Sequence, residues 1–391
     1  MSDSKWTTSN YDHQYKEYER EVRGFKALPG DEVSKDDVGL QWAPRKNGVY
    51  DFTPVRVALF GLGRIGTIHL EKIVSIPSIK LLYCVEDSIE RANYVSLVWR
   101  LEERGVKVIK SDSADEIYND PNVDAIFVCT PTLTHEEIVL KGLAKGKAIF
   151  CEKPFAKGQE AIEKCYKLAA EKSIPIFCAF NRRFDPGFAQ LRQRVKSGAV
   201  GQVHVVKTTS RDSPLPSMDY LRTSGGIYQD CIVHDIDLIC WVLGEYPTSV
   251  SSQAHCFRAD IAEFDDFDTV AVTMKFPSGT LGIIDVSRFA VYGYDIRLEA
   301  FGDKGMIDCN EKRPSEVVAS ADHGSTVSPI CFSFASRFYD AYRYEALHFV
   351  ELFKGLTEPS VTAESTLAVN RIASACEKAA RTRTTVEISW P

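Results

Sequence analysis

The stretch from residue 225 to residue 245, GGIYQDCIVHDIDLICWVLGE, carries polar side chains among many apolar ones. The apolar run and the closing Gly244 predict one helix that ends at this glycine. At about 100° per residue, Asp230, His234 and Asp237 form one stripe along such a helix. Histidine titrates near neutral pH, and a carboxylate one turn away can orient its ring, so the stripe could hold a general base. A surface helix with a packed core histidine has the same pattern.

A lysine follows the predicted strand AIFCE, residues 148–152. Ligands of doubly wound parallel sheets bind beyond the carboxyl ends of the strands, so Lys153 is expected to point toward a bound ligand. A lysine in an enclosed site can take part in proton transfer. The Lys153–Pro154 peptide bond could be cis, which would fix that direction. The alternative is a solvated lysine paired with Glu152.

The sequence GLGRIG, residues 61–66, matches the G-x-G-x-x-G pattern and lies between a predicted strand and a predicted helix. This context is typical of dinucleotide binding, because the helix N-terminus faces the pyrophosphate. Gly61 permits a tight turn, Gly63 lets the backbone approach the phosphates, and Gly66 allows close packing of helix on strand. Arg64 and Ile65 complete the predicted loop. A glycine-rich turn without a ligand is the alternative.

Glu86 ends the second predicted strand, 20 residues after Gly66. A carboxylate at this place accepts a hydrogen bond from the ribose 2′-hydroxyl and repels a 2′-phosphate, so NAD is favoured over NADP. Arg64 and Arg91 keep NADP open. Asp87 is the alternative to Glu86, because a strand end is uncertain by a residue or two.

Strands and helices alternate along residues 54–180, which predicts a doubly wound parallel sheet of the Rossmann type. Residues 181–391 contain longer stretches with alternating apolar and polar residues, joined by turns such as PSG and GDKG. They predict a second, substrate-binding and oligomerisation domain with a large, mostly antiparallel open sheet. Residues 1–53 are polar and aperiodic, and we predict an extension, in which KEYEREVRGFKAL could form one helix.

The composition excludes several classes of protein. The chain of 391 residues has a net charge of −7 and no block rich in lysine and arginine, so no nucleic-acid partner is expected. No stretch of 18 apolar residues predicts a membrane span, and the first residues do not resemble a signal or transit peptide. The 11 scattered cysteines lack a C-x-x-C pair and indicate reduced thiols of a cytoplasmic protein without a metal site.

Several motifs in order resemble the glucose–fructose oxidoreductase/inositol dehydrogenase/rhizopine catabolism (Gfo/Idh/MocA) family. They are VALFGLGRIGTIH, VCTPTLTHEE, FCEKPFA, FNRRFDPGF, SRD, SGGIYQDCIVHDIDLICWVLGE and YGYD. The resemblance runs from about residue 55 to the end and is nearest to the NAD-dependent inositol 2-dehydrogenases. It assigns central roles to Lys153, Asp230 and His234. It places Thr130, Pro131, His135 and Glu152 along the cofactor, and it implies polyol contacts from Arg182 or Arg183, Asp212 and Tyr294. Neighbours alternate sides in an extended chain, so only one of these arginines is expected to face the site, and we favour Arg182.

These residues together suggest the oxidation of a secondary alcohol, first myo-inositol to 2-keto-myo-inositol (scyllo-inosose). His234 is the predicted base, Asp230 orients it, with Asp237 as the rival, and Lys153 stabilises the reacting oxygen. Alternatives are an NAD(P)-dependent dehydrogenase of another sugar or dihydrodiol, or a non-catalytic dinucleotide-binding regulator. The open sheet and the resemblance imply a homodimer or homotetramer.

Overall fold

The computed structural model describes residues 45–46, 49–51 and 53–390, and the chain divides into two compact units, Met1–Thr53 and Pro54–Pro391. In the first unit the described strands β1 (Arg45–Lys46) and β2 (Val49–Tyr50) form one antiparallel pair. The rest of the predicted extension, including its possible helix at residues 16–28, lies outside the described residues.

The first sheet of the second unit has six parallel strands in the order β5-β4-β3-β6-β7-β8. This is the doubly wound order of dinucleotide-binding folds, as predicted. Near-continuous apolar sequences such as that of β6 are buried on both faces, because helices cover the two sides. The strands are β3 (Val55–Phe60), β4 (Ile79–Val85), β5 (Lys107–Ile109), β6 (Ala125–Val128), β7 (Ala148–Glu152) and β8 (Ile176–Ala179).

The helices between these strands are α2 (Arg64–Ser75), α3 (Ile89–Trp99), α4 (Asp115–Asn119), α5 (His135–Ala144) and α6 (Gln159–Lys172). Short 3₁₀ helices lie at η2 (Ser111–Ser113), η3 (Thr132–Thr134) and η4 (Asn181–Phe184).

The second sheet has seven strands in the order β14-β13-β9-β12-β11-β10-β17. All its pairs are antiparallel except β9 with β12, so the predicted mostly antiparallel sheet is confirmed. Alternate residues of β11 are buried and exposed, as expected for a sheet with one covered face. The strands are β9 (Val203–Arg211), β10 (Ser249–His255), β11 (Thr269–Lys275), β12 (Leu281–Ser287), β13 (Asp295–Gly302), β14 (Gly305–Cys309) and β17 (Val386–Glu387).

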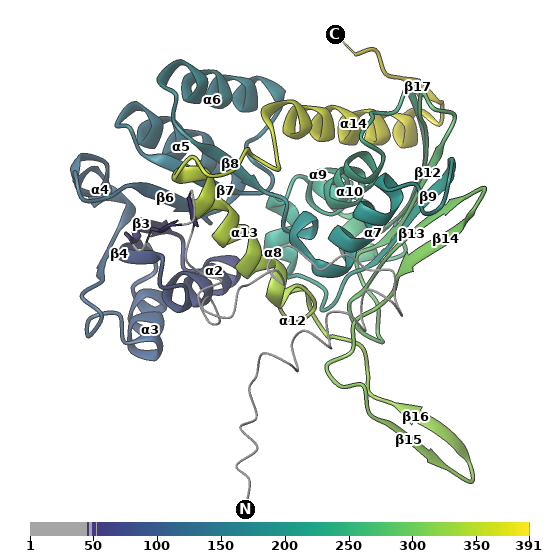
Figure 1. The fold of residues 1–391 in the computed structure, drawn as a ribbon, viewed down its shortest axis with the longest axis horizontal. Coiled ribbons are helices and arrows are strands. Elements are labelled where there is room, and N and C mark those ends of the chain that lie inside the picture. Colours follow the sequence, from purple (N-terminus) through teal and green to yellow (C-terminus); the bar gives the residue numbers. More distant parts are fainter. Residues whose placement is uncertain (1–44, 47–48, 52, 391) are drawn as a thin grey trace, which may run out of the picture. The chain divides into compact units, whose positions relative to one another are not determined.

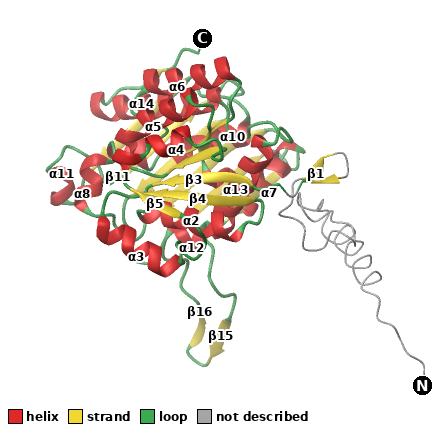
Figure 2. Cartoon of the chain, turned by 90° about the vertical axis from the view of Figure 1, so that its left-hand side faces the viewer, coloured by secondary structure: helices red, strands yellow, loops and turns green. Residues whose placement is uncertain are grey.

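Helices lie on the face of this sheet that is turned toward the first sheet (Figure 1). Among them, α10 packs on β9 and β12, and α14 contacts both β10 and α6. A hairpin of β15 (Val318–Ala321) and β16 (Gly324–Val327) projects away from the two sheets (Figures 1 and 2). The helices are α7 (Pro186–Lys196), α8 (Met218–Thr223), α9 (Gly226–Asp230), α10 (Val233–Leu243), α11 (Ala259–Ala262), α12 (Phe334–Arg337), α13 (Tyr339–Phe353) and α14 (Ala363–Thr382).

The predicted single helix over residues 225–245 is wrong, because the structure has two helices there. The carbonyl of Ile227 accepts hydrogen bonds from the N–H groups of both Cys231 and Ile232, each at 3.0 Å, which widens the turn at the end of α9. α10 then starts at Val233 and ends, as predicted, at Gly244, whose φ is 77°. Asp230 and His234 therefore lie on two different helices.

The boundary between residues 54–180 and 181–391 stays a prediction, although each segment builds its own sheet. No helix among the described residues has the length and apolar character needed to cross a membrane.

Gly63, which precedes α2, and Gly66, in the first turn of α2, provide a matched pair of substitutions. A Cβ atom at Gly66 would lie 2.0 Å from the carbonyl oxygen of Gly61, whereas one at Gly63 meets nothing within 4 Å. We expect Gly66→Ala to destabilise the fold by about 1–3 kcal/mol, because backbone must move. Gly63→Ala should leave the melting temperature unchanged and weaken binding of the predicted dinucleotide, measured by fluorescence titration. Equal melting temperatures of the two variants would contradict this packing role.

Candidate active site

A cavity of about 1200 Å³ lies at the carboxyl ends of strands β3, β4, β6 and β7. Its volume exceeds the range of about 300–1,000 Å³ that is usual for one drug-sized ligand, so it has room for a cofactor and a substrate. Both predicted halves of the chain contribute to its walls. The predicted site residues that line it are Gly61, Gly63, Arg64, Ile65, Glu86, Thr130, Pro131, Glu152, Lys153, Arg182, Asp212, Asp230, His234 and Tyr294.

Two predicted residues do not line this cavity. Gly66 packs against the turn at Gly61, as its predicted packing role requires. His135 was expected along the cofactor, but its ring nitrogens lie 2.8 Å from the carbonyl oxygen of Thr130 and 3.0 Å from that of Pro154. A neutral imidazole has one N–H, so the ring donates to one of these carbonyls at a time. His135 thus stabilises the loops beside Thr130 and Lys153.

The carboxylate of Glu86 is directed at the glycine loop. It accepts hydrogen bonds from the backbone N–H of Leu62 at 2.9 Å and from that of Ser88 at 3.0 Å. Asp87, the sequence alternative, instead holds the backbone and hydroxyl of Ser111. Glu86 is therefore the carboxylate that contacts the loop where a ribose of the dinucleotide is expected.

The two arginines that kept NADP open are engaged elsewhere. Arg91 donates from Nε to the carbonyl oxygen of Leu62 at 2.6 Å. The guanidinium of Arg64 lies over the rings of Phe334, at 4.9 Å, and Tyr220, at 5.6 Å. Stacked guanidinium groups of this kind are held by the ring faces. Neither contact is directed at a 2′-phosphate, which agrees with a site for NAD.

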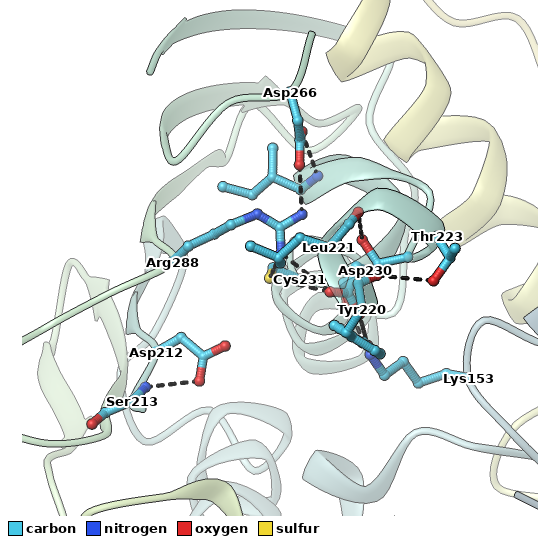
Figure 3. Close-up of polar contacts among 12 residues, drawn as sticks. Lys153, Asp212, Ser213, Tyr220, Leu221, Thr223, Asp230, Cys231, Asp266 and Arg288 are labelled. Carbon is cyan, nitrogen blue, oxygen red and sulfur yellow. Dashed lines mark hydrogen bonds and ion pairs between the residues drawn. The ribbon is translucent and has the colours of Figure 1, made fainter. Parts of the chain in front are cut away.

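The ammonium group of Lys153 meets Asp230 across the cavity (Figure 3). Its Nζ atom donates to the carbonyl oxygen of Asp230 at 2.8 Å and to its Oδ1 atom at 3.1 Å. The peptide bond between Lys153 and Pro154 is cis. Since Lys153 follows β7 and Asp230 ends α9, one ion pair joins the two sheets at the cavity.

Asp230 is buried and has further partners. Tyr220 donates its hydroxyl to Oδ1 at 2.8 Å, and Arg288 donates from Nη1 to Oδ2 at 3.2 Å. Burial by itself raises the pKa of a carboxyl group, but Lys153, Arg288 and Tyr220 outweigh it and lower the pKa of Asp230 below its usual value. Asp230 is therefore ionised at neutral pH.

The predicted hydrogen bond between Asp230 and His234 is absent. The Nδ1 atom of His234 is buried, and no hydrogen-bond partner for it is found in the described part of the chain. The rival orienter Asp237 accepts from Arg183 Nε at 2.9 Å instead. Burial, with the positive charges of Lys153 and Arg182, lowers the pKa of His234 well below its usual value. The ring is thus neutral at physiological pH without a carboxylate partner.

The three predicted polyol contacts gather on the side of the cavity formed by the second sheet. Arg182 is buried and donates from Nη1 to Asp235 at 3.0 Å and to Ser210 at 3.2 Å. The chain there is the 3₁₀ helix η4, so the assumption of an extended chain was wrong, although only Arg182 of the two arginines lines the cavity. Burial, followed by the charge of Asp230, raises the pKa of Asp212 to about 6. Burial also raises the pKa of Tyr294.

A buried group of titratable residues lies behind Glu152. His69 Nε2 is 2.7 Å from Glu152 Oε1 and 4.0 Å from Glu345 Oε1. His69 and Glu345 are fully buried, and neither carboxyl oxygen of Glu345 has a hydrogen-bond partner among the described residues. Burial, with Glu152 nearby, raises the pKa of Glu345 well above its usual value, so this carboxyl group is protonated at neutral pH. The spacing of residues along the chain contained no signal for the bond between His69 and Glu152.

Sequence reasoning also missed several polar wall residues. Asn181, Ser210 and Tyr220 line the cavity. Ser210 and Tyr220 lie in the stretch TTSRDSPLPSMDYLRTSGG, whose motif SRD was used only for Asp212. Hydroxyl groups in such a stretch were the available signal. For Arg288, which reaches Asp230 from the end of β12, the sequence contained no signal.

Comparisons with known proteins show which family the chain belongs to. Residues 55–180 match the model of an oxidoreductase family with an NAD-binding Rossmann fold, and residues 188–308 match the GFO/IDH/MocA C-terminal domain. Myo-inositol 2-dehydrogenase of Thermotoga maritima is 37% identical over 311 residues, which are 79% of this chain and 91% of the relative. The scyllo-inositol 2-dehydrogenase (NAD(+)) of Bacillus subtilis is 34% identical over 79% of this chain and 89% of its own length.

A solved structure of similar fold is that of a putative myo-inositol dehydrogenase from Sinorhizobium meliloti. It has a TM-score of 0.81 and 32% sequence identity, and the match covers 86% of this chain and 100% of that chain. The similarity therefore includes both sheets of the unit Pro54–Pro391.

The buried carboxyl group of Glu345 leads to a test of stability. An unfolded glutamate loses its proton above about pH 4.3, whereas the folded form keeps it, so the stability falls as the pH rises from there toward the folded pKa. Glu345→Gln keeps the neutral form, and we expect it to remove this loss, about 1.4 kcal/mol for each pH unit in that window. Urea unfolding at pH 5 and pH 8 measures it, with Glu358→Gln at an exposed position as the control. The same pH dependence in wild type and Glu345→Gln would contradict the protonated state.

Proposed function

This chain belongs to the Gfo/Idh/MocA oxidoreductase family, whose first domain binds NAD, and we propose that it oxidises a secondary alcohol of a cyclic polyol. The first candidate substrate is myo-inositol, with 2-keto-myo-inositol as the product. The observation that carries this proposal is the contact of Lys153 with Asp230 in the cavity that His234 and the glycine loop also line. The relatives named as inositol dehydrogenases support the choice of substrate.

The residues of the cavity fit NAD. Gly63 leaves the space that a pyrophosphate needs, and the N-terminus of α2 faces it. Glu86 holds a carboxylate beside the loop for the ribose hydroxyls. When bound, the nicotinamide accepts the hydride that leaves the carbon of the alcohol.

The proton of the alcohol goes to the protein. His234 is neutral and can accept this proton, while Lys153 donates a hydrogen bond to the reacting oxygen and stabilises its developing negative charge. Asp230 holds Lys153 in place and balances its charge. The C–H and O–H bonds of the alcohol break, and a C=O double bond forms, so the product is a ketone.

A polyol presents hydroxyl groups on all sides, and the wall of the cavity offers matching groups. Asp212 can accept hydrogen bonds, the guanidinium of Arg182 can donate them, and Tyr294 can do both. A site built to bind hydroxyl groups rejects analogues that lack them, because its own polar groups would stay unpaired. This supports a polyol and not an apolar alcohol.

Other substrates remain as outcomes of the same assay. The Bacillus subtilis relative is named for scyllo-inositol, so this isomer is the second candidate. A panel of candidate substrates assayed with NAD and with NADP would show whether another sugar or a dihydrodiol is oxidised. Binding of the dinucleotide without turnover of any of them would indicate a regulator.

We infer a homodimer or homotetramer with the outer face of the second sheet as the contact, since no described helix covers it (Figure 1). Large open sheet faces with exposed apolar side chains such as Leu281, Phe301 and Met306 usually need a partner. The 11 free cysteines agree with a reducing, cytoplasmic location.

Substitution of the proposed proton-transfer groups tests the mechanism. We expect Lys153→Met and His234→Ala to lower kcat for myo-inositol by about 10²–10⁴-fold, the usual contribution of a general acid or base. NADH formation at 340 nm measures the rate, and NAD titration checks that the cofactor still binds. Lys157→Met, at an exposed lysine four residues further on, is the control and should be fully active. Normal turnover by either site variant overturns the assignment.

The choice of cofactor depends on one carboxylate. Glu86→Gln keeps the size of the side chain and removes its charge, so we expect the ratio of kcat/KM for NAD over NADP to fall by about 10–100-fold, the worth of a hydrogen bond to a charged group. Asp87→Asn is the matched variant, because Asp87 binds Ser111 and not the glycine loop. A larger fall in Asp87→Asn than in Glu86→Gln would assign the ribose contact to Asp87.

A further inference from the structure

Arg288 is a fully buried arginine that the proposed mechanism does not use. It follows the last residue of β12, and its side chain is completely inaccessible to solvent. Its guanidinium group lies between two carboxylates: Nη1 is 3.2 Å from Asp230 Oδ2, and Nη2 is 2.9 Å from Asp266 Oδ2 (Figure 3). Arg288 does not line the cavity, so it can act on a ligand only indirectly, above all through Asp230, which does line it.

Asp266 continues this chain of contacts to the start of the helix that ends in Asp230. Its Oδ1 atom accepts a hydrogen bond from the backbone N–H of Ile227 at 3.0 Å. α9 is only five residues long, and a helix of that length is unstable by itself. The chain Asp266–Arg288–Asp230 therefore joins the first turn of α9 to its last residue.

The same chain fixes the direction of the Asp230 carboxylate. Oδ1 receives the ammonium of Lys153 and the hydroxyl of Tyr220, while Oδ2 receives Arg288. With both oxygens occupied, rotation of the carboxylate would break at least one bond to a charged group. The wider turn after Asp230 leaves no continuous helix to hold this residue, so side-chain contacts must do it.

We propose that Arg288 is a positioning residue of the alcohol oxidation: by bridging Asp266 and Asp230 it holds the carbonyl and carboxylate of Asp230 where they receive Lys153. This inference rests on the proposed function for its kinetic consequences. It assigns to Arg288 no contact with substrate or cofactor.

Charge balance gives Arg288 a second effect. Asp230 and Asp266 are two buried carboxylates, and Arg288 and Lys153 are the two cations in contact with them. Arginine stays charged at all accessible pH values, so its contribution does not titrate. The charged and titratable groups that act on Asp230 are Lys153, Arg288, Tyr220, Asp212 and Cys231. Without Arg288, Asp230 would take up a proton at a higher pH, and Lys153 would lose its ionic contact with Oδ1 and keep only its bond to the Asp230 carbonyl oxygen.

The test compares Arg288→Met, which removes the charge, with Arg288→Lys, which keeps the charge but cannot form the same bridge. In Arg288→Met we expect kcat for myo-inositol to fall by about 100-fold, the cost of a small misplacement of reacting groups. The acid limb of its kcat/KM profile should move up by about one pH unit, the effect of losing a nearby opposite charge. Arg288→Lys should restore the acid limb and only part of kcat, while KM for NAD stays unchanged in both.

Arg337→Met is the matched control. Arg337 is also fully buried, and its Nη1 atom binds Asp185 Oδ2 at 2.7 Å, away from Asp230. We expect a similar loss of melting temperature as in Arg288→Met, with the acid limb unchanged. If Arg288→Met and Arg337→Met show equal kcat and equal pH profiles, the positioning role is wrong and Arg288 is a structural residue only.

Two further measurements test the positioning role if Arg288→Met does not fold or if the wild type has no activity. If Arg288→Met does not fold, Asp266→Asn retains the bond to Ile227 and weakens only the bridge, and an unchanged kcat in that variant overturns the proposal. If the wild type oxidises no cyclic polyol, the proposed function fails, and hydrogen exchange of the peptide 226–232 still tests the bridge. Faster exchange there in Arg288→Met than in Arg337→Met supports it, and equal exchange overturns it.

Discussion

The contact between Lys153 and Asp230 is the interaction on which the arrangement of the cavity depends. The lysine comes from the end of a strand in the parallel sheet, and the aspartate comes from a short helix beside the second sheet. Their side chains are only 16% and 7% exposed, so separating the two charges would leave each of them poorly solvated and without its partner. Lys153 and Asp230 therefore stay in contact only while the distance between the two sheets is maintained. The helices α13, which contacts α2, and α14, which contacts both α6 and β10, maintain that distance.

Pairing of buried charges explains why an apolar helix carries so many acidic residues. The two consecutive arginines of η4 bind the two aspartates of α10: Arg182 binds Asp235, and Arg183 binds Asp237. Breaking such a buried pair by removing one partner costs about 3–5 kcal/mol, because the other charge is left uncompensated. These aspartates thus attach α10 to η4, and only Asp230 of the neighbouring helix is directed at the cavity.

His234 lies in a contrasting environment. His234 is buried near the positive charges of Lys153 and Arg182. Its Nδ1 atom has no hydrogen-bond partner among the described residues. Under the proposed function, a neutral His234 would be ready to accept the proton of the alcohol and would become a cation only during the reaction. Lys153 and Asp230 contribute opposite charges beside it, so the net field at the reacting oxygen is set by the pair and by Arg288 behind it.

The elements that the sequence determined by itself are those whose signals are local. The glycine loop, the alternation of strand and helix up to β8, the alternating pattern of the second sheet and the helix end at Gly244 all follow from neighbouring residues. Residue types at strand ends were also sufficient to select Glu86 and Lys153, because parallel strands deliver their carboxyl ends to one edge. These are properties of chain segments a few residues long. Asp212 was selected only by the family resemblance.

Only the tertiary structure decided which charged groups meet. The spacing of Asp230 and His234 predicted a bond between them, but the helix is interrupted between the two residues and no such bond forms. Asp230 instead binds Lys153, 77 positions earlier in the chain, and Arg288, 58 positions later. The buried group of His69, Glu152 and Glu345 arises in the same way. A buried charge pairs with the group that the packing of distant segments places beside it. The spacing of residues along the chain does not predict that packing.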